Sequence, residues 1–235
     1  MKLFIVAMLC VAVHAQTTLA VPHFADGNGW KSTLVLVDES PSPQTANVYF
    51  FDPNGGQVSL PIVGIGSTNV LGTTFTGNDS TFGETAGSAS TTTTGWMQIE
   101  TSGHIHGTLI FRQRVQGRPD FEASIPIVPA IQNDVIPFDN TNGFSTGLAM
   151  VNPFSVINQY SIIFRTESGV ILGSHQITLA VRNQTSFSVS QMFPETAGQR
   201  GSMQLTVAGS GRQNGFNWIA LRFNPTGAFT TLTLF

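Results

Sequence analysis

The sequence predicts an all-β protein built from two tandem antiparallel β-sandwich modules of the Ig-like type, related by internal duplication. Its apolar runs are short, rich in Val, Ile, Leu, Phe and Thr, and bounded by Gly, Pro, Asn and Asp, which is typical of strands. Helical periodicity is nearly absent, so no crossover helices are expected between the strands. The chain also matches itself in the same order over most of its length, which indicates tandem repetition.

The N-terminus has the pattern of a secretory signal peptide. A lysine precedes the short apolar run Leu3–Val13, and Val13-His14-Ala15 resembles the small-x-small site of signal-peptide cleavage. The run is shorter than the roughly 20 residues that cross a bilayer, so we expect no membrane span in the mature chain. Cys10, the single cysteine, would leave with the signal peptide. The sequence therefore predicts a disulfide-free protein that is secreted, held at the cell surface or retained in the periplasm.

The internal repeat is carried by several motifs that recur in the same order. Phe24–Trp30 (FADGNGW) aligns with Phe138–Phe144 (FDNTNGF), and Phe82–Gly87 (FGETAG) aligns with Phe193–Gly198 (FPETAG). Apolar runs between and after these motifs also match: Leu34–Val37 with Leu148–Val151, Val48–Phe50 with Ile162–Phe164, Gly95–Ile99 with Gly201–Leu205, and Leu109–Arg112 with Ile219–Arg222. Because the order is kept throughout, duplication explains the matches better than chance.

The repeat sets the expected domain boundaries. Residues 1–15 are the predicted signal peptide, 16–128 the first module and 135–235 the second module. The proline-spaced stretch Ile125–Asp134 is interpreted as the hinge between the modules, and residues 129–134 within it are the predicted linker.

Strands are expected wherever short apolar runs lie between turn residues. In the first module they are Ser32–Val37, Ala46–Phe51, Val58–Val63, Gly95–Glu100 and Gly107–Arg114. Asp52–Gly56 and Glu167–Gly169 have the composition of hairpin turns. The Gly, Ser and Thr tract Thr73–Thr94 carries little apolar surface and predicts a mobile surface loop, whereas Ser186–Phe193 predicts one short helical turn.

Four segments give the chain a family resemblance: FADGNGW, FDNTNGF, FRQR (Phe111–Arg114) and LRFNPTGAFTTL (Leu221–Leu232). With these motifs the chain resembles a group of secreted bacterial proteins, found mainly in soil bacteria, that carry tandem β-sandwich modules. The similarity covers nearly all of the mature chain. It implies export and a repeated β module. The group has no established activity, so the resemblance implies no catalytic residues.

Composition excludes one class of partner. Charged residues make up 10% of the chain, against roughly 25% in an average globular protein, and the formal net charge is −3. The few Lys and Arg residues form no basic stripe that would neutralise phosphates, so a nucleic-acid partner is not expected.

The strongest enzymatic pattern is Gly143-Phe144-Ser145-Thr146-Gly147, which satisfies G-x-S-x-G. In α/β-hydrolases this pattern exposes a serine nucleophile between a strand and a helix. Here an Asn-Gly turn precedes it and an apolar strand-like run follows it. A glycine-flanked turn that enters a strand is the simpler interpretation, and a hydrolase of unfamiliar design is the alternative. We expect no catalytic residues.

A metal site could start from His104 and His106, whose imidazoles would share one face of an extended segment. His23 or Glu100 are the only evident sources of a third ligand, and the second module has no matching pair, so exposed strand-end histidines are the simpler interpretation. No cofactor is expected.

Three oxygen-rich turns resemble the beginning of a calcium loop: Asp26–Gly29, Asp52–Gly55 and Asp139–Gly143. All three lack the downstream glutamate that completes such a loop. Asn, Asp and Gly residues that form turns account for them equally well, and calcium remains the alternative.

Tryptophans are candidates for sugar contacts, because aromatic rings stack on pyranose faces. Phe144 replaces Trp30 in the second module, as expected of a core position. Ser202 replaces Trp96, so Trp96 is the candidate for an exposed ligand contact.

Charged residues that recur in both modules predict structural roles. Glu84 and Glu195 are interpreted as caps of a turn or short helix rather than as a pair of glycosidase carboxylates. Arg112 and Arg222 align at the end of an apolar strand, which predicts an ion pair or backbone hydrogen bonds common to both modules.

The sequence thus predicts a non-catalytic extracellular module with a structural or adhesive role. Its expected partners are cell-surface or matrix polysaccharides or other surface proteins, and a carbohydrate-binding protein is the main alternative. If a special activity exists, it should involve features that the two modules do not share, namely Thr73–Thr94, Trp96 and the His104 region.

Overall fold

The computed structural model describes residues 17–209 and 213–232, and the predicted signal peptide with Cys10 lies outside them. Within the described residues the chain forms strands β1 to β18, one helical turn α1 (Val189–Met192) and one 3-10 turn η1 (Pro194–Thr196). All strand pairs are antiparallel. The predicted all-β antiparallel class is therefore confirmed. In this part of the chain, neither helical segment has the length and apolar character needed to cross a membrane.

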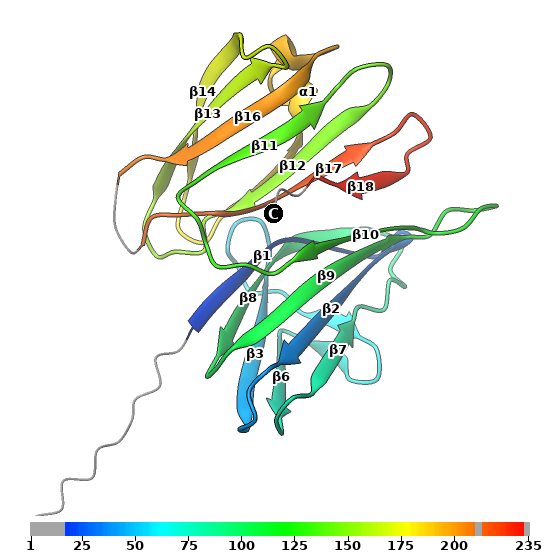
Figure 1. Ribbon diagram of the computed structural model, residues 1–235. Coiled ribbons are helices and arrows are strands. Elements are labelled where there is room, and N and C mark those ends of the chain that lie inside the picture. The colour runs from blue at the N-terminus through cyan, green and yellow to red at the C-terminus, as the bar shows by residue number, and fades with distance from the viewer. Residues whose placement is uncertain (1–16, 210–212, 233–235) are drawn as a thin grey trace, which may run out of the picture.

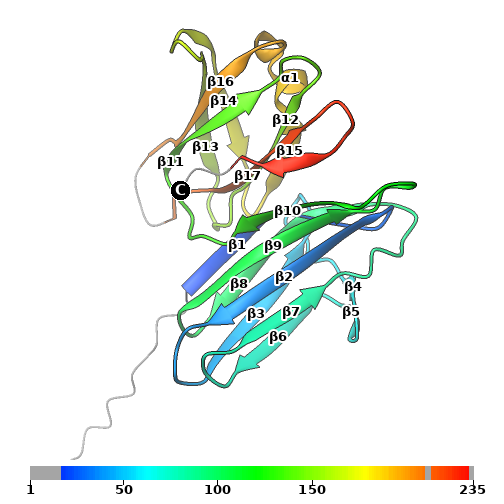
Figure 2. The ribbon, with the colours of Figure 1, turned by 45° about the vertical axis from the view of Figure 1, so that its right-hand side comes forward.

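The first sandwich contains two four-stranded sheets (Figure 1). One has the order β1 (Thr17–Asp26), β8 (Thr93–Thr101), β3 (Gln44–Phe51), β6 (Val70–Phe75). The other has the order β10 (Phe121–Pro126), β9 (Ile105–Gln113), β2 (Trp30–Asp38), β7 (Ser80–Glu84). A small ribbon of β4 (Leu60–Ile62) and β5 (Gly66–Thr68) stands at the side of this sandwich (Figure 2).

The second sandwich repeats this arrangement strand for strand. One sheet has the order β11 (Asn133–Asp139), β16 (Arg200–Val207), β13 (Asn158–Thr166), β14 (Ile171–Leu179). The other has the order β18 (Phe229–Thr231), β17 (Asn217–Phe223), β12 (Ser145–Val151), β15 (Gln184–Ser188). An internal duplication would produce the same strand order in both sandwiches.

The strand order differs from that of an immunoglobulin domain. There the first strand pairs with the second, whereas here β1 pairs with β8 and β2 pairs with β9. The Ig-like expectation therefore holds for the two-sheet architecture and not for the strand order.

One glycine in each sandwich shows how closely the two registers agree. Gly95 lies opposite Phe24, and Gly201 lies opposite Phe138. A Cβ atom added to either glycine would lie 1.9 Å from a backbone carbonyl oxygen, that of Phe51 or of Arg165. Only glycine fits this close approach, which explains why both sandwiches carry it.

The predicted alignment of Arg112 with Arg222 is wrong by one residue. Ser32 and Thr146 make equivalent hydrogen bonds, each to the backbone N–H and C=O of the residue seven positions before it. Ser32 lies opposite Phe111, but Thr146 lies opposite Arg222. Arg222 therefore occupies the position of the buried Phe111.

The predicted loop Thr73–Thr94 is wrong in part, although residues 76–79 and 86–92 do lie outside strands. It contains the end of β6, all of β7 and the start of β8. The hairpin at Glu167–Gly169 is confirmed, because the Thr166 N–H donates to Val170 O at 2.9 Å and β13 pairs with β14. The helical turn expected within Ser186–Phe193 is present as α1.

The two sandwiches pack against each other through an apolar junction. Strands β1 and β10 are edges of the two sheets of the first sandwich, and both face the outer side of sheet β18-β17-β12-β15 (Figures 1 and 2). The buried cluster of the first sandwich therefore continues into Ala149, Ile219 and Phe229 of the second. The Phe229 ring stacks on Trp30 at a centroid distance of 5.3 Å.

The segment between the sandwiches is held by backbone hydrogen bonds. Ile131 and Phe216 exchange two such bonds, at 3.0 and 2.9 Å, and the Ile127 N–H donates to Gly107 O at 2.9 Å. The residues predicted to form a hinge are thus tied to β9 and to the segment before β17.

Candidate functional site

Trp96, the predicted ligand contact, is fully buried at 0% exposure. Its ring stacks on Phe51 at a centroid distance of 4.6 Å, in a cluster with Ala20 and with Val151 of the second sandwich. The exposed-contact prediction for Trp96 is therefore wrong. Trp96 does lie on the outer face of its sheet, but the second sandwich covers that face, which the sequence alone could not reveal.

Next to Trp96, the same sheet face forms a groove that remains open. It has a volume of about 400 Å³, and the side chains that line it with polar groups are those of Tyr49, Gln57, Gln98, Glu100 and Arg182, beside Phe51 and Gly55. We call these five residues the junction groove, because Arg182 belongs to the second sandwich and the others to the first. A second cavity of about 320 Å³ adjoins it and shares Gln98 and Arg182.

The groove floor is built by strand alternation. Met97 and Ile99 of β8 are buried in the core, so Gln98 and Glu100 lie on the outer face. The register places Gln98 between Ala20 of β1 and Tyr49 of β3. The sheet therefore presents neighbouring polar and aromatic side chains in the groove.

Arg182 lies in the turn between β14 and β15, and its side chain lines the groove. Its backbone adopts a φ of +57°, which is unfavourable for a residue with a side chain. Two backbone hydrogen bonds hold this turn: the Arg182 N–H donates to Phe154 O at 3.2 Å, and the Gln184 N–H donates to Pro53 O at 2.9 Å. As a result the guanidinium carbon lies 5.7 Å from the centre of the Phe51 ring.

Gln98 has a buried acceptor without a donor. Its Nε2 donates to Glu100 Oε1 at 2.8 Å, while among the described residues no donor reaches its Oε1. In the second sandwich the equivalent Gln204 accepts a hydrogen bond from Arg165 at 2.9 Å. Phe51 stands at the position of Arg165, so the first sandwich cannot make this bond within itself.

No family model, no curated protein and no solved structure matches the chain. The resemblance to secreted bacterial proteins therefore stays a prediction, and the function proposed below is derived from the geometry of the described residues.

His23 lies in the junction, at an irregularity in β1 between Val21 and Phe24. Its Nδ1 lies 3.1 Å from Gln184 Nε2, and it borders a largely apolar cavity of about 300 Å³ lined by β12, β15 and β17. Burial lowers the pKa of His23 to about 4, so the ring is neutral at physiological pH.

Ser145 is the first residue of β12 and pairs with Phe223 of β17. Gly143 before it has a φ of +79°, and the whole segment from Ser145 to Val151 is a strand. The structure therefore confirms the interpretation of this pattern as a turn that enters a strand.

His104 and His106 are exposed on one face and flank the buried Ile105, as the extended spacing predicts. His106 Nε2 lies 3.5 Å from Glu39 Oε2. Neither His23 nor Glu100 joins them: in the described part of the chain no three His, Cys, Asp or Glu side chains gather in a way that would hold a metal ion.

The aspartates of the oxygen-rich turns accept backbone hydrogen bonds. Asp52 Oδ1 accepts from the Asn54 and Gly56 N–H groups at 2.8 and 2.9 Å, which are contacts of a turn-forming residue. Asp26 Oδ1 instead accepts from the N–H of the distant Gly87 at 2.7 Å, and so ties its turn to the segment after β7.

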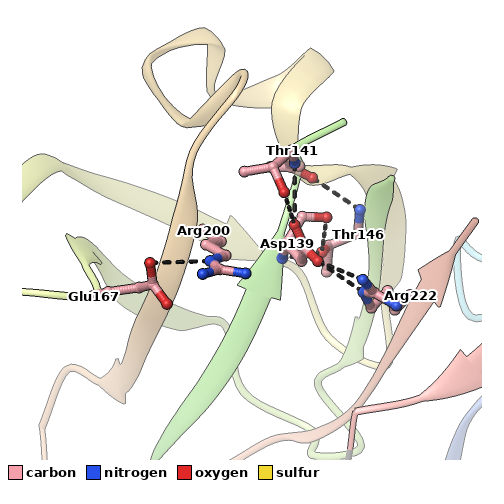
Figure 3. A network of polar contacts seen from close by, with 7 residues as sticks. Asp139, Thr141, Thr146, Glu167, Arg200 and Arg222 are labelled. Carbon is pink, nitrogen blue, oxygen red and sulfur yellow. Dashed lines mark hydrogen bonds and ion pairs between the residues drawn. The ribbon is translucent and has the colours of Figure 1, made fainter. Parts of the chain in front are cut away.

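Asp139 belongs to a polar network at the end of the second sandwich (Figure 3). Its carboxylate accepts hydrogen bonds from Thr141 and from the Arg222 guanidinium, at 2.7 to 3.1 Å. Burial alone would raise the pKa of Asp139, but the Thr141 and Arg222 bonds hold this pKa below its ordinary value. The Arg222 guanidinium also lies 3.5 Å from the centre of the Phe144 ring. Arg222 therefore forms an ion pair with Asp139. Arg112 lies instead 3.9 Å from Glu84 and 3.7 Å from Asp120, so both arginines form ion pairs but the partners are not common to the two modules.

Glu84 and Glu195 have different partners. Glu84 forms an ion pair with Lys31 at 2.8 Å, and the Lys31 bond lowers its pKa. Glu195 bonds to His175. Burial alone would raise the pKa of Glu195, but its own backbone N–H and His175 lower it. Both carboxylates connect strands or turns within their own sandwich, so they do not form a pair.

Proposed function

We propose that this protein is a secreted, non-catalytic module with a structural or adhesive role outside the cell or at its surface. The apolar junction supports this proposal most directly. Because Phe229, Ile219 and Ala149 extend the first core into the second sandwich, the two units act as one stiff element. Such an element holds its ends at a fixed spacing. Its partners would be surface or matrix polysaccharides or other surface proteins.

Beads coated with residues 16–235 test adhesion. They should attach to the extracellular matrix or surface of the producing cells, and beads coated with the heat-unfolded protein should not. Small-angle scattering of the same protein should fit one fixed arrangement of the sandwiches. The absence of attachment together with a flexible junction would refute the proposal.

A hydrolase screen tests the non-catalytic part. Wild type and Ser145→Ala should both leave ester, peptide and glycoside substrates intact. Turnover by wild type that Ser145→Ala abolishes would overturn this part of the proposal.

Carbohydrate binding is the second candidate function, and the junction groove favours it. The groove combines an aromatic side chain with amide, carboxylate and guanidinium groups, which are the groups that bind sugar rings and hydroxyls. A glycan array probed with wild-type protein tests this candidate. If no glycan binds, this second candidate is refuted.

A further inference from the structure

We infer that the junction groove binds a neutral oligosaccharide, with a sugar ring against Tyr49 and a sugar hydroxyl donating to Gln98 Oε1. This inference rests on the second proposed function and names its site and ligand class. It differs from the expectation for Trp96, whose ring supports the groove from below through Phe51.

The unpaired acceptor of Gln98 is the main observation. Gln98 is only 7% exposed, lines both adjoining cavities and has no donor to its Oε1 among the described residues. Its amide orientation is set by the bond from Nε2 to Glu100, so the carbonyl end cannot exchange places with the amino end without loss of that bond. A buried acceptor left unpaired is unfavourable, and a hydroxyl donor from a ligand would relieve this.

The charge of the groove indicates a neutral ligand. Arg182 and Glu100 contribute one positive and one negative group to the same lining. A strongly anionic ligand would meet Glu100, and a cationic ligand would meet Arg182. Sugar hydroxyls are compatible with both groups, because a hydroxyl can donate to a carboxylate and accept from a guanidinium.

Among the described residues, the groove combines side chains of the first sandwich with Arg182 of the docked second one. At the equivalent positions the second sandwich has Ile163 for Tyr49 and Thr206 for Glu100. Its own Arg165 satisfies Gln204. The arginine of the groove comes instead from the turn of the second sandwich, held at φ +57° by its backbone contacts.

The test compares two substitutions at equivalent glutamines. Gln98→Met removes the unpaired acceptor and keeps the side-chain length, and Gln204→Met is its matched control in the second sandwich. Calorimetry with short neutral oligosaccharides of glucose, mannose, galactose, xylose or N-acetylglucosamine, chosen by the array, should show at least about tenfold weaker binding for Gln98→Met. Gln204→Met should keep wild-type affinity and instead lower the melting temperature, because it breaks the bond from Arg165.

Tyr49→Ala and Arg182→Gly provide independent variants, each verified as folded by circular dichroism. Glycine tolerates the positive φ at position 182, so Arg182→Gly removes the guanidinium without backbone strain. Both should weaken binding by about tenfold or more. If wild type binds neutral oligosaccharides and these variants bind equally well, the groove inference is overturned while carbohydrate binding stands. If wild type binds only charged glycans, the inference of a neutral ligand is overturned. If wild type binds no glycan, both are overturned.

Discussion

One contribution to the loss of stability on acidification should come from a side chain at the junction, His23 of β1. The ring lies between Phe111, at a centroid distance of 6.0 Å, and Gln184 of the second sandwich. The adjoining cavity is lined by β12, β15 and β17, mainly through apolar side chains. A protonated imidazole in these surroundings loses hydration that the contacts do not replace.

The magnitude follows from the two pKa values. The ordinary pKa of histidine is 6.5, and burial lowers that of His23 to about 4. Above pH 6.5 the ring is neutral in both the folded and the unfolded protein, so it contributes nothing. Between these values only the unfolded chain takes up the proton, and the free energy of unfolding falls as the pH falls. At about 1.4 kcal/mol for each pH unit, the loss reaches at most about 3 kcal/mol and levels off below about pH 4.

Urea unfolding followed by tryptophan fluorescence measures this loss at several pH values between neutral and about pH 4. His23→Gln keeps a polar side chain and cannot titrate, so the wild type should lose up to about 3 kcal/mol more than this variant. Carboxylates whose pKa is lowered in the fold, such as Asp139 and Glu84, titrate in both proteins and cancel in the difference. His106→Gln, at an exposed position, should follow the wild-type curve. If wild type and His23→Gln lose the same stability, His23 is not held neutral by the junction.

Three further changes test the packing. Phe229→Ala removes a ring that stacks on Trp30 and meets Phe121 edge to face. It should lower the free energy of unfolding by about 3 kcal/mol and split urea unfolding into two transitions, and an unchanged midpoint would contradict the junction. Gly95→Ala forces a Cβ against the Phe51 carbonyl and should cost about 3 kcal/mol or prevent folding. Gly83→Ala meets only the end of the Leu71 side chain, so it should be mild, and equal effects of the two in thermal unfolding would refute this distinction. Asn152→Ala removes amide bonds to the Val156 and Ala180 carbonyls at 2.7 and 2.9 Å and should cost about 2 kcal/mol in urea unfolding, whereas the exposed Asn69→Ala should change little.

Sequence patterns predicted the strands that bury a clear alternating face. In β3, for example, Ala46, Val48 and Phe50 enter the core and alternate with outward residues. Strands β6 and β7 lie at sheet edges, where β6 buries little besides Phe75. Because these edges are held mainly by backbone pairing to β3 and β2, their Thr and Gly residues gave no hydrophobic signal.

The sequence repeat also predicted which residues of the two sandwiches occupy equivalent positions, and one of these alignments was wrong. Gly95 and Gly201 share a steric requirement, so their alignment agrees with the register. The alignment of Arg112 with Arg222 relied only on the shared residue type, because an arginine at the end of a strand meets no steric condition that only arginine can fulfil. The structure shifts it by one position, because the Ser32 and Thr146 hydrogen bonds fix the register of β2 and β12.

Phe51 and Arg165 occupy equivalent positions in the two sandwiches, and their different surroundings show why the candidate groove could not be predicted from one module alone. In the second sandwich, Arg165 is only partly buried and reaches Gln204. In the first, the docked second sandwich covers the position, and a charged side chain there would lose hydration, so Phe51 packs on Trp96 instead. Gln98 then loses its internal donor, while Arg182 arrives from outside the module and lies over Phe51. The docked second sandwich thus buries Trp96, which the sequence predicted to be an exposed ligand contact. Beside it, the Oε1 atom of Gln98 is left without a hydrogen-bond donor among the described residues. A single chain of contacts, from Val151 through Trp96 and Phe51 to Arg182, therefore links the packing of the junction to the groove.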